Sequence, residues 1–223
     1  LVDHELQLAL ELADPGLTPL LAVNRLYGPS MRLINNHAII NWLELNYLTE
    51  STVIGSGHVQ GIVDAFNLLT SFFASSEPTF EFIRQALRKF EAMKDISRRN
   101  PLYVVGLVSI IESLLTTPQE GKTDNSLSHQ LKAKLTLFNN RLPIPIDLGK
   151  YFPGGRSLEI RTVVGKLYNY RSDIAHGNSS NFSKELAVLE SHDAVCKFLH
   201  TLIRHLLLQA VREPSLVRDI KSC

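Results

Sequence analysis

The stretch that decides the fold class is "LYVVGLVSIIESLL", residues 102–115. It is apolar on nearly every side, and only Glu112 and two serines interrupt it. A helix that is apolar all round is normally buried among other elements. We therefore predict a central buried helix here, with other helices packed around it.

Apolar residues at helical spacing also mark the segments on both sides of this stretch. In the segment before it, apolar residues at 80, 83, 87, 90 and 93 alternate with basic ones, which predicts an amphipathic helix. Further helices are predicted over 127–138, 158–176 and 185–213, the last with Ser183 as its N-cap. Residues 139–155 are predicted to form a loop, because prolines and glycines interrupt them. From residue 77 on, the chain is thus predicted to be an all-α bundle of about five helices.

Residues 1–76 are predicted to be a mostly helical N-terminal extension. Helices are expected over 1–13 and 32–48, and a third follows the glycine-rich "GSGHVQG" at 55–61. This motif superficially resembles a dinucleotide-binding turn, but that turn requires a βαβ unit around it, which the sequence lacks. A glycine-rich turn between helices is therefore favoured. The small and polar "ASSEP", residues 74–78, predicts a domain boundary between 76 and 77.

Composition describes an ordinary folded protein with an uneven charge. The 223 residues are 44% hydrophobic and 20% charged, and the formal net charge is +1. Residues 1–60 hold two basic and six acidic side chains, whereas residues 61–223 hold 21 basic and 16 acidic ones. The basic second part mildly favours a polyanionic partner.

Cysteine usage and hydropathy bear on the compartment. The two cysteines, Cys196 and Cys223, do not form a disulfide framework, so a reducing, cytoplasmic setting is expected. No apolar run reaches the length of a membrane span, and the start lacks the basic region of a signal peptide. The start also lacks a methionine, so we expect a piece of a longer protein, with a further domain or partner missing.

Cysteine and histidine residues near the C-terminus are weak candidates for a metal site. Cys196 and His200 are four residues apart on a predicted helix, with His192 and His205 nearby. Zinc normally takes four ligands, usually from a second paired cluster, which the sequence lacks. We expect ordinary surface or half-buried residues here, and neither a metal nor a cofactor.

The most informative segment for function is "YNYRSDIAHGN", residues 168–178. His176 would stand in the last helical turn, where a cation is favourable, and Gly177 suits a cap with positive φ. Five residues at about 100° each leave Arg171 and His176 about 140° apart around the helix, whereas Ser172 and His176 share one stripe. A site using Arg171 and His176 therefore requires the helix to end or bend, or a second copy of the chain.

Glu112 is the other ionisable group with an unusual position. In so apolar a helix it requires a partner or a wet pocket. It would form an ordinary salt bridge or lie at an exposed helix edge, or else it would orient the basic residues of a site. Both alternatives stay open at this stage.

Together these segments resemble the HEPN superfamily, and specifically its Apea-like branch. The family signature has an arginine, a short polar residue and, a few positions on, a histidine near the helix end; Ser172 after Arg171 is the form of that branch. The resemblance covers about residues 78–212. It rests on "FIRQALRKFEAMKD" (82–95), "VSIIESLL" (108–115), "SLSHQLKAKL" (126–135) and "LYNYRSDIAHG" (167–177).

The resemblance implies a metal-independent endoribonuclease that acts on RNA as a homodimer, as the effector of a microbial defence or toxin system. It implies Arg171 for phosphate binding and His176 as general acid or base. Ser172 and Tyr168 would support them as an orienting hydroxyl and a stacking ring, and Glu112 would orient basic groups. Arg98, Arg99 and Lys166 would steer RNA. Some family members are not nucleases, so a non-catalytic dimerisation or nucleotide-binding module is the alternative.

Overall fold

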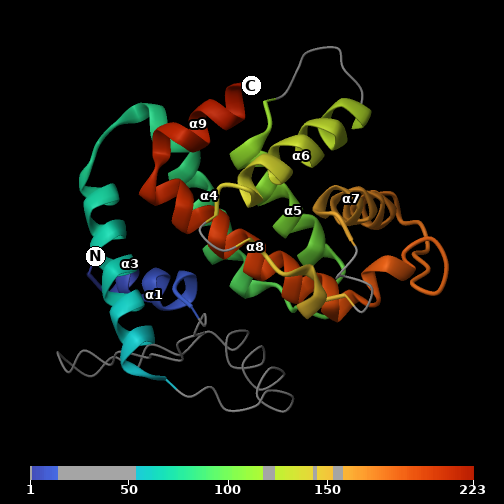
Figure 1. The fold of residues 1–223 in the computed structure, drawn as a ribbon, viewed down its shortest axis with the longest axis horizontal. Helices are drawn as coiled ribbons and strands as arrows, with labels where there is room; N and C mark the ends of the chain where they lie inside the picture. The colour runs from blue at the N-terminus through green and yellow to red at the C-terminus, as the bar shows by residue number, and fades with distance from the viewer. Residues whose placement is uncertain (1, 15–53, 118–123, 143–144, 153–157) are drawn as a thin grey trace. The chain divides into compact units, whose positions relative to one another are not determined.

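The computed structural model describes residues 2–14, 54–117, 124–142, 145–152 and 158–223. Within these ranges the chain consists of helices and connecting turns, with no strand, which confirms the all-α prediction (Figure 1). It divides into two compact units. One comprises Leu1–Ser76 with Lys94–Ser97, and the other comprises Glu77–Met93 with Arg98–Cys223.

The first unit is built on two packed helices, α1 (Val2–Leu12) and α3 (Ser56–Ala74). The contact buries Leu8 and Leu12 of α1 and, in α3, Leu69 and Phe72. Both helices were predicted, and α3 begins directly after the glycine at 55. The helix expected over 32–48 lies outside the described residues.

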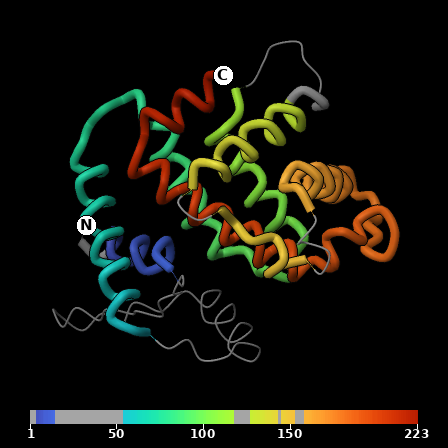
Figure 2. Tube along the Cα trace, in the orientation of Figure 1, coloured from blue at the N-terminus to red at the C-terminus, as the bar shows by residue number. Residues whose placement is uncertain are grey.

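The second unit surrounds α5 (Leu102–Leu115), which confirms the prediction of a central buried helix. Eight of its fourteen residues are buried, since α5 contacts every other helix of the unit (Figures 1 and 2). Those helices are α4 (Glu81–Ala92), α6 (Asp124–Asn139), α7 (Ile160–His176), α8 (His192–Arg212) and α9 (Pro214–Ser222).

The predicted closing helix over 185–213 is wrong at its N-terminal end. Ser191, not Ser183, is the N-cap of α8, and its Oγ accepts a hydrogen bond from the Ala194 N–H at 3.2 Å. Residues 183–190 form turns and a short 3₁₀ segment, and Glu190 has a φ of 62°, which an α-helix cannot contain. The Ser183 N–H instead donates to Asn181 Oδ1 at 2.8 Å.

A further helix, α9, was not predicted. Pro214 stands in its first turn, a position that suits proline, and Val217 and Ile220 face the core. Hydrogen bonds from two lysine side chains join the last turn of α9 to neighbouring helices. The Lys134 ammonium donates to the Lys221 carbonyl at 2.8 Å, and the Lys221 ammonium donates to the carbonyl of Ser113. Cations at these carbonyls oppose the negative ends of α9 and α5.

Helix α8 is long and apolar enough to cross a membrane by length and composition. Sequence inspection did not expect such a run. Most of this helix is buried within the fold, however, and the core helix of a bundle passes the same test.

Helix α7 carries most of the functional segment, and it packs against α6. The loop predicted over 139–155 is confirmed in its described parts, apart from one 3₁₀ turn at Leu148–Lys150. Asn139, the last residue of α6, accepts through Oδ1 the Ile146 N–H at 2.9 Å, which fixes the start of this loop. The chain then enters α7 at Ile160, so α6 and α7 run antiparallel.

Candidate functional site

Arg171 on α7 faces Glu112 on α5. Arg171 Nη2 lies 3.8 Å from Glu112 Oε2, and the two side chains are 25% and 17% exposed. At this distance the charges attract without a direct hydrogen bond. The Arg171 guanidinium also lies over the Tyr168 ring, 5.9 Å from its centroid. Of the two alternatives for Glu112, a salt bridge is therefore present, and its partner is the arginine of the candidate site.

One donor of Arg171 is left over. Its Nε–H is buried and has no hydrogen-bond partner among the residues that the structure describes. An unsatisfied buried N–H costs about 1–3 kcal/mol, more on a charged group. The guanidinium is thus held in one orientation, and because this N–H is buried, an incoming phosphate would meet the partly exposed remainder of the side chain.

His176 ends α7 and is exposed. Gly177 follows it with a φ of 71°, the left-handed conformation that glycine adopts without steric cost, as predicted. The Asn178 N–H donates to the Asp173 carbonyl at 2.8 Å, and the Gly177 N–H donates to that of Ile174 at 3.2 Å. The helix therefore ends sharply after the imidazole.

Within one chain, Arg171 and His176 do not meet. Across the described residues, no hydrogen bond, ion pair or ring contact joins them. His176 is still helical, so the two side chains keep the divergence of about 140° expected from their spacing. Arg171 is directed toward α5, and His176 is directed to solvent.

The supporting residues are dispersed. Ser172 is half-buried on α7, on the His176 side of the helix. Lys166 is also half-buried, but it lies about 80° from His176 around the helix axis. Arg98 and Arg99 lie in the turn before α5, and Arg99 is exposed.

A hydrogen-bonded chain links α7 to that turn. The Arg98 carbonyl lies 2.7 Å from His192 Nε2, and His192 Nδ1 lies 2.8 Å from the Tyr170 hydroxyl. Because a carbonyl can only accept, Nε2 carries the proton, and Nδ1 accepts from the Tyr170 O–H. Burial, with Cys196 nearby, raises the pKa of Tyr170 to about 12, so the phenol stays a donor. Sequence reasoning missed this series of hydrogen bonds, because Arg98 and His192 are 94 residues apart in the sequence.

Cys196 is more deeply buried than the sequence indicated, whereas His200 is half-buried, as expected. Cys196 is 4% exposed, and burial raises its pKa to about 12, against a lowering effect of Arg98. Burial, with Arg98 and Arg204 nearby, lowers the pKa of His200 to about 3. Neither group is therefore a ready nucleophile or base at neutral pH. In the described part of the chain, no three His, Cys, Asp or Glu side chains are grouped to hold a metal ion.

Comparison with protein-family models, with curated proteins and with solved structures finds no match for this chain in any of the three.

Proposed function

We propose that the chain is a HEPN-type, metal-independent endoribonuclease. The observation that carries the proposal is the arrangement at the end of α7: Arg171 is held against Glu112 and Tyr168 with an unused donor, and His176 stands exposed at the helix end. An arginine with spare donors and an accessible imidazole are the two groups needed for cutting RNA without a metal.

The reaction is an attack of a ribose 2′-OH on the adjacent phosphate. The 2′-O–P bond forms, the P–O5′ bond breaks, and the products are a 2′,3′-cyclic phosphate and a 5′-hydroxyl. His176 takes the 2′-OH proton or supplies the proton that the leaving 5′-oxygen gains, because an imidazole exchanges protons near neutral pH. Arg171 binds the phosphate while negative charge develops on its oxygens.

The site is shared between two copies of the chain. Since Arg171 and His176 diverge on one helix, a two-fold axis near the end of α7 would bring both pairs to one phosphate. In such a site Ser172 would orient His176. Tyr168 would hold the guanidinium, but its burial at 8% exposure leaves no room for its ring to stack a base, contrary to the sequence prediction. A strict monomer in light scattering at high protein concentration would contradict this arrangement.

By analogy with the family, the protein would act in the cytoplasm as an effector of a microbial defence or toxin system, together with a partner domain. This setting rests on the resemblance of residues 78–212 alone. Growth arrest on expression, relieved by His176→Ala, is the outcome expected from it.

A second candidate is a non-catalytic dimerisation or RNA-binding module. It is favoured by the same ion pair, because Arg171 opposite a mostly buried Glu112 is also what a purely structural contact between α5 and α7 requires. In that case both Arg171→Ala and Glu112→Ala would destabilise the fold, and no RNA would be cut.

Cleavage in the presence of EDTA separates the two. Purified protein and the variants His176→Ala and Arg171→Ala are incubated with single-stranded RNA. His205→Ala and Arg212→Ala, two exposed residues of α8, are the matched controls. We expect a loss of about 10²–10⁴ for His176→Ala and about 10²–10³ for Arg171→Ala, with both controls near wild type. Cleavage that survives both site substitutions refutes the assignment.

A further inference from the structure

The solvent face of α7 carries a stripe that ends at His176. Gly165 and His176 are eleven residues apart, which places them within about 20° around the helix axis. Arg161, one turn before Gly165, lies about 40° from it on the same side. Arg161 and Gly165 therefore share the face of His176, whereas Arg171 lies on the core side.

Gly165 allows a lysine of α6 to lie against this face. A Cβ on Gly165 would stand 2.9 Å from Lys132 Cε and 3.2 Å from Lys132 Nζ. The first distance is shorter than real Cβ contacts and the second is tighter than most, so the flexible end of Lys132 would have to move aside. Glycine inside a helix costs about 1 kcal/mol relative to alanine. At this position it makes room for the Lys132 ammonium directly against α7.

Two cations in this groove are uncompensated. The side-chain nitrogens of Lys132 and Arg161 form no hydrogen bond or ion pair within the described ranges, and the backbone carbonyl of Lys132 accepts from Thr136 Oγ1 at 2.7 Å. The surface cations of α4 and α9 differ, since Arg88 pairs with Glu81 at 3.1 Å and Arg218 pairs with Asp219 at 3.2 Å. The groove between α6 and α7 thus carries two positive side chains near Gly165, on the face of α7 that ends at His176.

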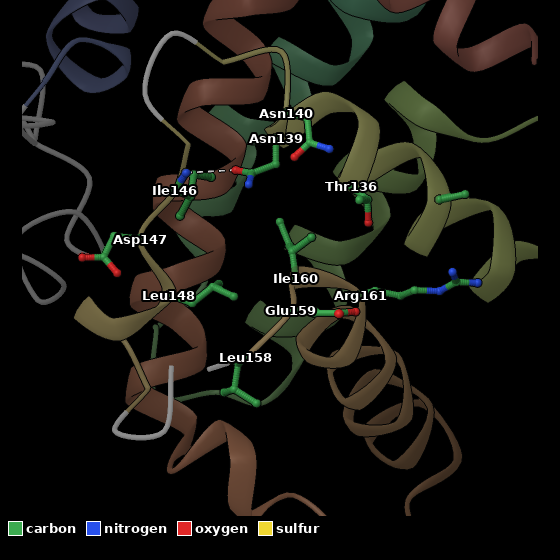
Figure 3. Close-up of a pocket in the computed structure, with 11 residues that line it drawn as sticks. Thr136, Asn139, Asn140, Ile146, Asp147, Leu148, Leu158, Glu159, Ile160 and Arg161 are labelled. Carbon is green, nitrogen blue, oxygen red and sulfur yellow. Dashed lines mark hydrogen bonds between the residues drawn. The ribbon is translucent and has the colours of Figure 1, made fainter. Parts of the chain in front are cut away.

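A cavity of about 790 Å³ lies at the Arg161 end of this groove (Figure 3). This volume is within the range of sites for small ligands. Its apolar part is Ile146, Leu148, Leu158 and Ile160, and its polar part includes Thr136, Asn139, Asn140 and Arg161. Of its acidic groups, Glu159 lies beside Arg161, and Asp147 points away from the cavity and accepts the Gly149 N–H at 2.9 Å.

We propose that the groove between α6 and α7 binds single-stranded RNA on its way to His176. Lys132 and Arg161 contact phosphates, and one nucleotide of the strand occupies the cavity, with its base on the aliphatic side chains. Gly165 lies about 16 Å from His176 along the helix, so these contacts hold the strand beyond the cut phosphate. The proposal rests on the proposed function, because it takes RNA as the substrate.

Binding is measured separately from cleavage. The probe is a fluorescein-labelled oligoribonucleotide with 2′-fluoro groups, which lacks the attacking hydroxyl, and affinity is followed by anisotropy from 50 to 200 mM salt. Each lost phosphate contact lowers the slope of log K against log salt by about 0.7 for a single strand. We expect this loss for Lys132→Gln and for Arg161→Gln, but not for the surface controls Lys89→Gln and Arg218→Gln.

Two matched pairs test the groove itself. Gly165→Ala displaces Lys132 and should weaken binding in the same direction as Lys132→Gln, whereas Gly61→Ala in α3, where a Cβ meets nothing within 4 Å, should not. Ala133 is exposed and lines the cavity. Ala133→Glu adds a negative charge there and should lower the salt slope by about 0.7, and Ala133→Gln, with the same shape, should not.

The outcomes separate this proposal from the ribonuclease assignment. Binding that weakens as described supports the groove, even if natural RNA is left uncut. If wild type cuts RNA while the groove variants bind like their controls, the groove is refuted and the ribonuclease stands. Absence of RNA binding by wild type refutes the groove as well.

Discussion

Acidification from pH 7 to pH 5 should destabilise the second unit through His200. Burial lowers the pKa of this imidazole from 6.5 to about 3, helped by Arg98 and Arg204, so the folded protein keeps it neutral. Its ring packs against Phe90, with centroids 5.5 Å apart. A folded pKa below the unfolded one gives stability that is full above pH 6.5 and is lost as the pH falls toward 3.

The magnitude follows from the unfolded state. At pH 5 the histidine is almost fully protonated in the unfolded state and neutral in the folded state. This difference lowers the free energy of unfolding by about 2 kcal/mol relative to pH 7. The value hardly depends on the folded pKa, provided that this lies well below 5. It is a large share of the stability of a domain of this size.

Urea unfolding at both pH values, followed by circular dichroism, measures this loss. The control is His200→Gln, which keeps a polar side chain that does not titrate. Because the chain has eight histidines, the informative quantity is the difference between wild type and variant. We expect wild type to lose about 2 kcal/mol more than the variant. Equal losses would refute the inference that His200 stays neutral in the folded protein.

Three further outcomes are expected. Tyr170→Phe leaves Nδ1 of the half-buried His192 without its donor and should cost about 1 kcal/mol in urea unfolding; a neutral result would contradict this hydrogen bond. Ser191→Ala should lower the free energy of unfolding by about 1 kcal/mol, while Ser183→Ala should change it by less than about 0.5 kcal/mol. The reverse order would support the longer helix that begins after Ser183. Gly177→Ala should cost about 1–2 kcal/mol in thermal unfolding, because alanine is strained at a φ of 71°; an unchanged melting temperature would argue against this cap.

The helices most accessible to sequence reasoning were those with a clear pattern. The apolar run of α5 predicted its burial, and its contacts with every other helix of the unit confirm it. The end of α7 was predicted from Gly177, because few other residues adopt a positive φ there. Both features depend on residues that are close together in the sequence, so the sequence alone could predict them.

The start of α8 could not be read in this way. Leu186 and Leu189 continue its apolar pattern and are buried at 1% and 0% exposure, yet both lie in turns before the helix. Apolar spacing reports burial, whichever backbone conformation achieves it. Sequence reasoning chose Ser183 as the cap, and the hydrogen bond from Ala194 identifies Ser191 instead.

The candidate site was predicted in its members but not in its contacts. Arg171 and Glu112 stood out separately, each for its own reason, and their pairing required α5 and α7 to be packed. Lys132 gave no signal at all, because an amphipathic helix carries many such lysines. Its position against α7 follows only from the structure, where it lies beside Gly165 of the other helix.

The most direct test of the central claim uses an oligodeoxynucleotide with a single ribonucleotide, incubated with the protein in EDTA. Only one 2′-hydroxyl is present, so the account predicts one cut, leaving a 2′,3′-cyclic phosphate and a 5′-hydroxyl. The His176→Ala variant should cut at least about 10² times more slowly. Cleavage of the all-deoxy strand, or an undiminished rate for His176→Ala, would contradict the account.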